Sequence, residues 1–186
     1  MPPPVRTPRR SWIDAGLALL AQEGPDAVRV EVLAQRLGVT RGGFYRQFEG
    51  RSDLVTAMLD EWEQRSIDEV RARVEAEGGD VQSRVTRAGA LTFSDELVPL
   101  DLAVRDWARR DSDVAARLRR VDTRRIGFLR ELLGAVCEDA DEVEARALLA
   151  FSLAIGTHVI AADHPGPRQR VVRDATRLIL AGVTPV

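Results

Sequence analysis

The segment from Val28 to Phe48 constrains this chain more than any other, because it carries two short helical patterns joined by the turn Leu-Gly-Val-Thr. Gly38 is predicted to end the first helix with a positive φ, and Thr40 is predicted to cap the next helix through its hydroxyl. Two helices joined in this way are typical of a helix-turn-helix that reads DNA. Apolar residues at spacings of three and four form the buried stripe of the first helix, namely Val30, Leu33, Ala34 and Leu37.

The second helix of this pair is predicted to begin at about Arg41. Phe44 and Phe48 are four residues apart and would anchor the helix to the core. The presence of Gly42 and Gly43 inside a helix needs an explanation, because each glycine lowers the stability of a helix by about 1 kcal/mol relative to alanine. Close approach of the backbone to DNA is the reason we infer. The alternative is that this segment is a frayed helix or a loop.

The run GVTRGGFYRQF, followed by Arg51, Ser52, Asp53 and Leu54, resembles the N-terminal domain of the TetR family (TetR/AcrR type) of bacterial transcription regulators. The resemblance covers the N-terminal part of the chain by motif and the remainder only by length and helical pattern. It implies a homodimer that releases DNA when a small molecule binds its C-terminal domain. It also implies that Tyr45 and Arg51 contact the DNA backbone. Arg29 stands where the family usually has Ser or Thr, so it keeps a phosphate contact but cannot cap the helix.

Residue type assigns roles within the DNA-binding part. Arg41 and Gln47 have the hydrogen-bonding geometry to read guanine and adenine, whereas the neighbouring polar residues suit phosphate contacts. The predicted DNA-binding residues are Arg29, Thr40, Arg41, Gly42, Gly43, Tyr45, Arg46, Gln47 and Arg51. A basic arm precedes them and either follows phosphates or a minor groove, or is a solvated tail; its residues are Arg6, Arg9 and Arg10.

The periodicity of the whole chain predicts an all-α fold of about nine helices, and no strand pattern competes with it. We expect a three-helix helix-turn-helix domain over residues 1–52 and a helical effector-binding and dimerisation domain over residues 53–186. A long helix that begins at about Arg51 would link the two domains. The other predicted helices cover residues 9–23, 81–97, 100–110, 114–136, 142–162 and 168–181.

Charge is divided unevenly along the chain, although the net charge is only −2. Residues 1–52 carry eight Arg and five acidic residues, a net charge of +3, and residues 53–186 carry nineteen Arg and twenty-four acidic residues, a net charge of −5. A basic end that holds the motif attracts phosphate, while the acidic remainder discourages non-specific binding. All the basic residues are Arg, which we interpret first as a bias of codon usage or lineage.

Other features of the sequence narrow the class of protein. No apolar run reaches the ~18 residues of a membrane helix, and MPPPVRTPRR lacks the apolar core of a secretory signal, so we expect a cytoplasmic protein. The single Cys137 excludes an internal disulfide and a cysteine-based zinc site. Its apolar neighbours indicate a packing residue.

The C-terminal helices carry bulky or polarizable side chains on apolar faces, and these would line a pocket for a small apolar ligand. Plain packing is the alternative for each of them. The predicted ligand-binding residues are Met58, Trp62, Phe93, Trp107, Phe128 and His158.

The last two helices are apolar on more than one face, which favours a four-helix dimer interface, with a monomer core as the alternative. The predicted interface residues are Phe151, Ala154, Ile155, Val159, Val171, Ala175, Leu178 and Ile179.

The sequence therefore predicts a ligand-responsive repressor that binds a palindromic DNA operator as a homodimer and is released by an unknown small-molecule effector. A helical protein-interaction module that kept the fold without binding an operator is the alternative, although the intact Arg41, Tyr45 and Arg51 argue against it. A helical enzyme ranks last, because His158 and His164 lack the i, i+4 spacing of metal ligands. We expect no catalytic residue, metal or cofactor.

Overall fold

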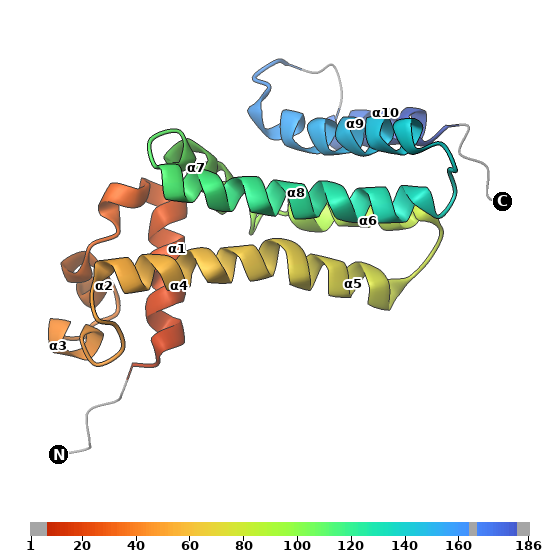
Figure 1. Cartoon of the computed structure of the whole chain (residues 1–186). Helices are drawn as coiled ribbons and strands as arrows, with labels where there is room; N and C mark the ends of the chain where they lie inside the picture. Colours follow the sequence, from red (N-terminus) through yellow and green to blue (C-terminus); the bar gives the residue numbers. More distant parts are fainter. Residues whose placement is uncertain (1–6, 164–166, 182–186) are drawn as a thin grey trace. The chain divides into compact units, whose positions relative to one another are not determined.

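The computed structural model describes residues 7–163 and 167–181, and within these ranges it contains helices, turns and no strand (Figure 1). Arg6 and His164 lie outside the described residues. The helices, in chain order, are α1 Arg9–Glu23, the 3₁₀ turn η1 Pro25–Ala27, α2 Val30–Arg36, α3 Arg41–Phe44, α4 Arg51–Glu63, the π-helical segment η2 Gln64–Glu69, α5 Val70–Glu77, α6 Val81–Thr92, α7 Val98–Ala108, α8 Ser112–Gly134, α9 Ala140–Val159 and α10 Arg168–Leu180.

The predicted all-α fold is confirmed. Because α4, η2 and α5 follow one another along the chain without a gap, they are counted here as one helix. With η1 left out, the described residues then form nine helices, as predicted.

Two details of the predicted helices are wrong. Thr40 is the N-cap residue of α3, but its hydroxyl makes no capping hydrogen bond, because the Thr40 carbonyl closes this single turn by accepting the Gly43 N–H at 2.9 Å. The helix predicted to begin at residue 100 begins at Val98, so Pro99 lies in its first turn, where a residue without an N–H is tolerated. The positive φ predicted for Gly38 is confirmed at 67°.

The described residues divide into two compact units. Unit 1 contains the residues up to Arg65 together with Pro99–Leu118, and unit 2 contains Ser66–Val98 and the residues from Arg119 onward. In this division α4 belongs to unit 1, where its Leu54, Met58 and Trp62 are fully buried, and the boundary after residue 52 stays a prediction.

Aromatic rings form the centre of unit 1. Trp12 of α1 packs edge-on against Phe44 of α3, and Phe44 stacks on Phe48 with ring centroids 5.1 Å apart. The predicted anchoring role of Phe44 and Phe48 is therefore confirmed. The buried apolar residues around them include Leu17, Leu19, Leu20, Val28, Val30, Leu33, Ala34, Leu54, Met58 and Trp62.

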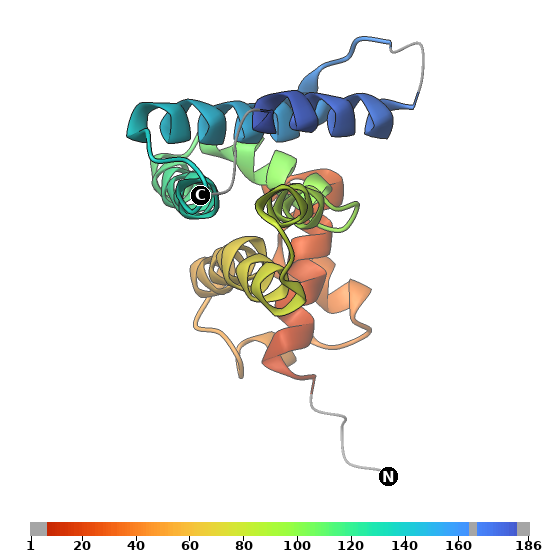
Figure 2. The same ribbon diagram turned by 90° about the vertical axis from the view of Figure 1, so that its right-hand side faces the viewer.

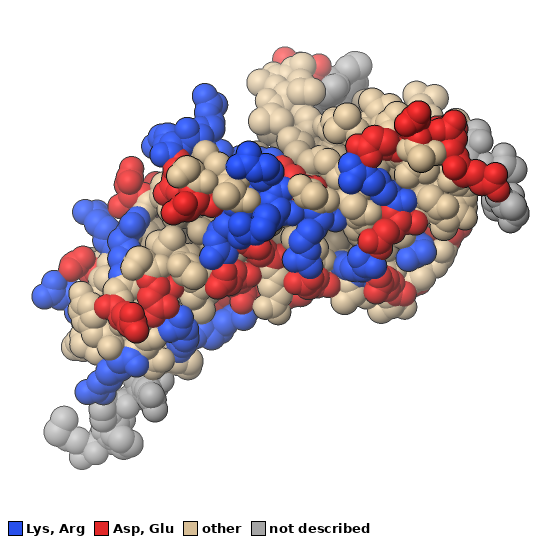
Figure 3. Space-filling view, viewed as in Figure 1, with Lys and Arg blue, Asp and Glu red and all other residues tan. Residues whose placement is uncertain are grey.

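Ion pairs reinforce the packing of α1 against α4. Arg65 donates to both Glu61 and Asp14, and Arg10 lies 2.7 Å from the buried Glu61 carboxylate. Burial lowers the pKa of Arg65, but the hydrogen bonds to Glu61 and Asp14 outweigh this effect and raise the pKa above its ordinary value. Ion pairs of the described residues join arginine to aspartate or glutamate, and the two charges are mixed over the face shown in Figure 3.

Unit 2 packs α5, α6, the C-terminal part of α8, α9 and α10 around its own core. The α9 and α10 helices lie alongside each other, as Figures 1 and 2 both show. The buried residues of this core are Val70, Val74, Val85, Ala88, Leu97, Phe128, Leu129, Leu132, Leu133, Ala147, Phe151 and Leu180. Within the described residues, no helix combines the length and the apolar character needed to cross a membrane.

Candidate DNA-binding surface and effector cavity

The α3 helix presents polar side chains on a rigid support. Phe44 is fully buried, whereas Arg41 and Tyr45 have 64% and 60% of their surface exposed and Arg46 is also exposed. The Tyr45 ring packs edge-on against Phe44 with centroids 5.2 Å apart, so this exposed ring is held in place. The arrangement directs two cations and one aromatic ring outward from a single turn.

Arg41 is paired within the unit, but weakly. Its Nη1 donates to Glu31 Oε1 at 2.9 Å, and both side chains are more than half exposed. The pKa of Glu31 lies below its ordinary value of 4.5, first because of a backbone hydrogen bond and then because of Arg41. Exposed ion pairs contribute little to stability, so Arg41 can exchange Glu31 for another acceptor at small cost.

The glycines of α3 are not required by the packing of the unit. A Cβ on Gly42 would stand 3.7 Å from Thr40 Oγ1, and one on Gly43 would stand 3.7 Å from Trp12 Cζ2, which are ordinary contacts. Neither glycine has a positive φ. The fold itself therefore accepts a larger residue at either position.

Gln47 and the basic arm are engaged inside unit 1. The Gln47 amide donates to the Thr7 carbonyl at 3.4 Å, and the Gln47 carbonyl accepts from Arg9. Arg9 also lies 3.0 Å from Asp53 and stacks over the Phe48 ring at 4.1 Å, and Arg10 pairs with acidic residues of α1 and α4. The described part of the predicted arm is thus bound to the fold.

Arg51 also turns toward the fold. Its Nε donates to the Val28 carbonyl at 2.7 Å, and its Nη2 donates to the Pro25 carbonyl at 2.8 Å. These bonds tie the first turn of α4 to the loop that precedes α2. Arg29 is the exposed N-cap residue of α2 and makes no side-chain capping bond.

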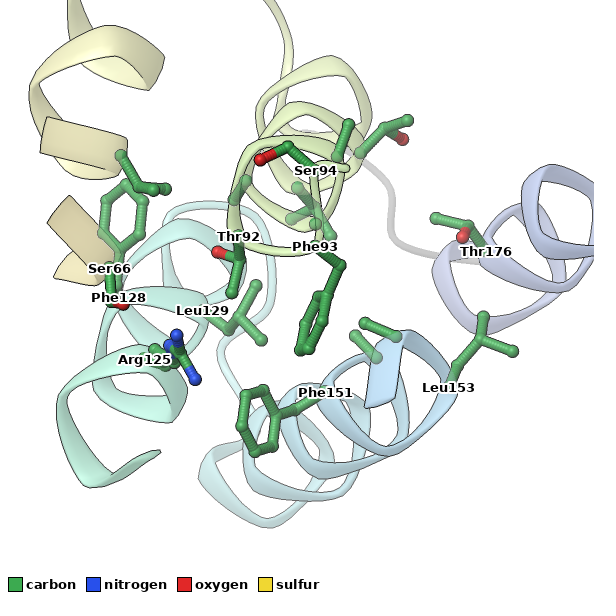
Figure 4. Close-up of a pocket in the computed structure, with 18 of the residues that line it drawn as sticks. Ser66, Thr92, Phe93, Ser94, Arg125, Phe128, Leu129, Phe151, Leu153 and Thr176 are labelled. Carbon is green, nitrogen blue, oxygen red and sulfur yellow. The ribbon is translucent and has the colours of Figure 1, made fainter. Parts of the chain in front are cut away.

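Unit 2 contains a cavity of about 900 Å³, formed by η2, α5, α6, α8, α9 and α10 (Figure 4). Three of the six residues predicted to bind a ligand line it, namely Phe93, Phe128 and His158. The other three do not: Met58 and Trp62 are fully buried in unit 1, and Trp107 is a half-buried residue of α7.

Phe93 is the central aromatic residue of this cavity. His158 stacks on it with ring centroids 5.6 Å apart, and the Phe151 ring lies 6.3 Å away. The guanidinium carbon of Arg125 is 5.9 Å from the same ring centroid. In Figure 4, Ser66, Thr92 and Arg125 lie toward the left of the view, and Leu153 and Thr176 lie toward the right.

The prediction from the sequence missed the three buried polar residues of this cavity, namely Ser66, Thr92 and Arg125. A signal for two of them was available. Ser66 falls four residues after Trp62 and four before Val70, within a buried apolar series. Arg125 interrupts a buried stripe on α8 in the same way, between Val121 and Phe128.

The α9 and α10 helices leave an apolar surface exposed. Of the predicted interface residues, Val159, Val171 and Leu178 are exposed, while Ala154, Ile155, Ala175 and Ile179 are half-buried. Phe151 is buried inside the unit and lines the cavity. Three exposed apolar residues were not predicted, namely Leu148, Leu149 and Ile160.

Comparison with known proteins gives a family match for the N-terminal part of the chain and a fold for nearly all of it. Residues 13–58 match the family model described as bacterial regulatory proteins of the tetR family. A protein of unknown function from Rhodococcus sp. RHA1 superimposes with a TM-score of 0.74 and 19% identity, covering 99% of this chain and 100% of that one. A putative transcriptional regulator from Saccharomonospora viridis in complex with choline superimposes with a TM-score of 0.73 and 16% identity, covering 95% of this chain and 97% of that one.

A regulator of the TetR/AcrR family from Thermobifida fusca gives a TM-score of 0.64 and 17% identity, covering 94% of this chain and 97% of that one. The search of curated proteins found no match. The family match covers the helix-turn-helix, and the structural matches extend over nearly the whole chain. The chain therefore carries, over residues 13–58, a domain that matches the tetR family of bacterial regulatory proteins.

Proposed function

We propose that this protein is a repressor that binds a palindromic operator as a homodimer and leaves the DNA when a small molecule enters the cavity of unit 2. The observation that carries the proposal is the exposure of Arg41, Tyr45 and Arg46, on α3 and the turn that follows it, beside the buried Phe44 and Phe48. A regulator of this kind acts on DNA in the cytoplasm and needs no catalytic group.

In the proposed complex, the start of α3 enters the major groove, as in other helix-turn-helix proteins. Arg41 leaves Glu31 and donates to a guanine edge, while Tyr45 and Arg46 contact phosphates. Gly42 lets the backbone approach the DNA closely. Arg51 and Gln47 hold this surface in place through the bonds that they already make.

The exposed apolar side chains of α9 and α10 support a homodimer. Val159, Val171 and Leu178 lie on helices that pack against each other, so a second copy of the same pair would complete a four-helix interface. A two-fold dimer presents two copies of α3, which accounts for a palindromic operator.

The cavity supports the effector part of the proposal. Its volume of about 900 Å³ falls within the range of small-molecule sites, and its walls are largely apolar. The choline complex of the Saccharomonospora viridis regulator shows that a protein of this fold takes a small molecule.

A fluorescence-anisotropy titration tests the proposal. Purified protein is titrated against DNA from immediately upstream of its own gene and against an unrelated duplex, at low and high salt. We expect selective binding that weakens steeply as salt increases. Arg41→Ala and Tyr45→Ala should each weaken binding, whereas Arg73→Ala, which removes an exposed arginine of α5, should not. Unchanged binding by both α3 variants contradicts the proposal, and no binding to either duplex favours the protein-interaction module.

A further inference from the structure

We infer that the cavity of unit 2 takes an uncharged molecule with an aromatic body and one hydrogen-bonding oxygen, and that the Ser66 hydroxyl binds this oxygen. This inference rests on the proposed function, in which a small molecule occupies this cavity. It adds the chemical class of that molecule.

The hydroxyl of Ser66 is a hydrogen-bonding group that the described residues leave without a partner. Ser66 is 1% exposed, and no hydrogen bond reaches its Oγ. The residue lines the cavity from η2, and π-helical segments of this kind are frequent at functional sites. Burial of a hydroxyl without a partner is unfavourable, so a ligand oxygen beside Ser66 would supply the missing hydrogen bond.

The charged side chains of the cavity wall are either paired inside unit 2 or exposed to solvent. Three arginines of the wall form ion pairs, namely Arg71 with Glu131, Arg124 with Asp68 and Arg125 with Asp122. The other ionisable lining residues, Asp95, His158 and Arg173, are exposed. The wall therefore offers a ligand no unbalanced buried charge of either sign.

This balance of charges determines which head group the cavity accepts. A charged ligand would have to displace a partner from one of the ion pairs or enter the cavity without a counter-ion. Transfer of a charge from water to an apolar site is unfavourable unless an opposite charge meets it there. A ketone or hydroxyl oxygen avoids this penalty and still bonds to Ser66. Uncharged ligands are therefore favoured over carboxylates and ammonium ions.

Aromatic rings set at different angles define the body of the ligand. Phe93, Phe128 and Phe151 line the cavity, and Figure 4 shows the Phe93 side chain pointing toward Phe151. The ring planes of Phe93 and Phe151 are inclined by 52°, whereas His158 is stacked on Phe93 at 18°. Aromatic pairs prefer offset-stacked or edge-to-face contacts, and inclined rings offer both to an aromatic guest.

Small residues leave the space that such a guest would fill. Those that line the cavity are Ala88, Gly89, Ala90, Gly127, Ala150 and Ala154. A Cβ on Gly89 or Gly127 would meet no atom within 4 Å, so the space beside α6 and α8 is open. The cavity volume of about 900 Å³ accommodates a fused-ring molecule.

Isothermal titration calorimetry with matched probes tests this inference on the full-length wild-type protein. Methyl naphthyl ketone, naphthoate and naphthylmethylammonium share one ring system, substituted at the same carbon, and differ in the charge of the head group. We expect the ketone to bind at least about tenfold more tightly than either ion, because only the ions lose hydration without gaining a counter-charge. Binding of either ion as tightly as the ketone overturns the inference, as does failure of the ketone to bind.

Ser66→Ala locates the oxygen of the ligand. The variant should weaken binding of the ketone about fivefold and leave binding of ethylnaphthalene unchanged, because only the ketone loses a hydrogen bond. The melting temperature should not decrease, since the hydroxyl that is removed lacks a partner. Ser152→Ala, which changes an exposed serine of α9 outside the cavity, should bind both probes like the wild type. Unchanged binding of the ketone, or an equal loss for both probes, contradicts the role of Ser66.

Gly127→Leu locates the body of the ligand. The leucine side chain would occupy the open space beside α8, so this variant should lose binding of the ketone and of ethylnaphthalene. Leucine also favours a helix more than glycine does, so the variant should fold. Gly134→Leu is the matched control, because Gly134 lies on the same helix, has equal space for a Cβ and does not line the cavity. Undiminished binding by folded Gly127→Leu overturns the inference.

The same probes separate this inference from the proposed function. If the ketone binds in the manner expected but the protein never binds DNA, the repressor function fails and the site for an uncharged ligand stands. If the protein binds its operator and naphthoate or naphthylmethylammonium releases it more effectively than the ketone does, the repressor function stands and the site for an uncharged ligand fails.

Discussion

Trp12 packs edge-on against Phe44, with ring centroids 5.4 Å apart and ring planes at 75°. This contact fixes the four-residue helix α3 to α1, and it also determines which glycine of α3 lies next to the core. A Cβ on Gly43 would touch Trp12, whereas a Cβ on Gly42 would have only Thr40 Oγ1 within 4 Å. Gly42 is exposed, so its lack of a side chain serves no contact inside the unit.

The first prediction concerns Gly42→Ala. The variant should be more stable than the wild type by about 0.5–1 kcal/mol, because alanine loses less backbone entropy in a helix. It should nevertheless bind operator DNA about tenfold more weakly, because the added methyl group keeps the backbone away from the DNA. Thermal unfolding and anisotropy measure the two effects.

Gly38→Ala is the matched control for this variant. Its φ of 67° is strained for a residue with a Cβ, so the substitution should destabilise the protein by about 1–2 kcal/mol. Gly42→Ala with unchanged DNA affinity would remove the argument for close backbone approach.

The second prediction distinguishes a positioning role of Arg51 from a DNA contact. Arg51→Gln removes the bonds to the Val28 and Pro25 carbonyls, so it should lower the free energy of unfolding by about 1 kcal/mol. DNA affinity should fall with it, because the loop before α2 is released.

Arg46→Gln provides the comparison, since Arg46 is an exposed side chain of the α3 surface. It should weaken DNA binding while changing stability by less than about 0.5 kcal/mol. Loss of DNA binding in Arg51→Gln at unchanged stability would instead assign Arg51 the phosphate contact that the sequence predicted.

The third prediction concerns the apolar surface of α9 and α10. Leu178 is 77% exposed, so a charged residue there is compatible with the folded unit but not with an apolar dimer interface. Leu178→Glu should convert the dimer to a monomer in analytical ultracentrifugation. The melting temperature of the wild type should increase with protein concentration, and that of the variant should not.

Ala76→Glu, on the exposed side of α5, should leave the dimer intact. A wild-type protein that sediments as a monomer at all concentrations would overturn the assignment of this surface.

The fourth prediction concerns acid. The pKa of Asp53 lies below its ordinary value of 3.8, first because of the hydrogen bond from Arg9 and then because of the Glu49 backbone N–H. A lowered pKa stabilises the folded state above pH 3.8, and this contribution is lost as the pH falls through the lower value.

The melting temperature of Asp53→Asn should therefore decrease less than that of the wild type when the pH falls below 3.8. Arg9→Gln should behave similarly, because it removes the partner of Asp53, whereas Arg36→Gln should follow the wild type. Identical acid curves for Asp53→Asn and the wild type would show that this carboxylate does not contribute.

The sequence predicted those features of the fold that depend on local patterns. Phe44 and Phe48 could be assigned to the core from their spacing, and Gly38 could be assigned to the turn because glycine is the residue that adopts positive φ without strain. The approximate positions of most helices followed from the same periodicity, although α6 ends at Thr92 and not at residue 97.

The partners of polar side chains could not be predicted, because they depend on contacts between distant segments. Arg51 reaches carbonyls 23 and 26 residues away, and Arg9 reaches Gln47 and Asp53, which are 38 and 44 residues away. The cavity could not be predicted for the same reason, because the residues that line it come from distant segments of the chain. Phe93 and His158 lie on different helices and meet only in the folded unit, whereas Met58 and Trp62 satisfy the same apolar pattern in another core.

The ion pairs of this protein use guanidinium groups, and the sequence contains no lysine. Acetylation of lysine, which removes positive charge from many DNA-binding surfaces, therefore has no side-chain target here. The positive charge presented by Arg41 and Arg46, and the ion pairs that hold α1 to α4, remain when cellular acetyl donors accumulate. The proposed DNA binding therefore cannot be controlled by acetylation of lysine side chains.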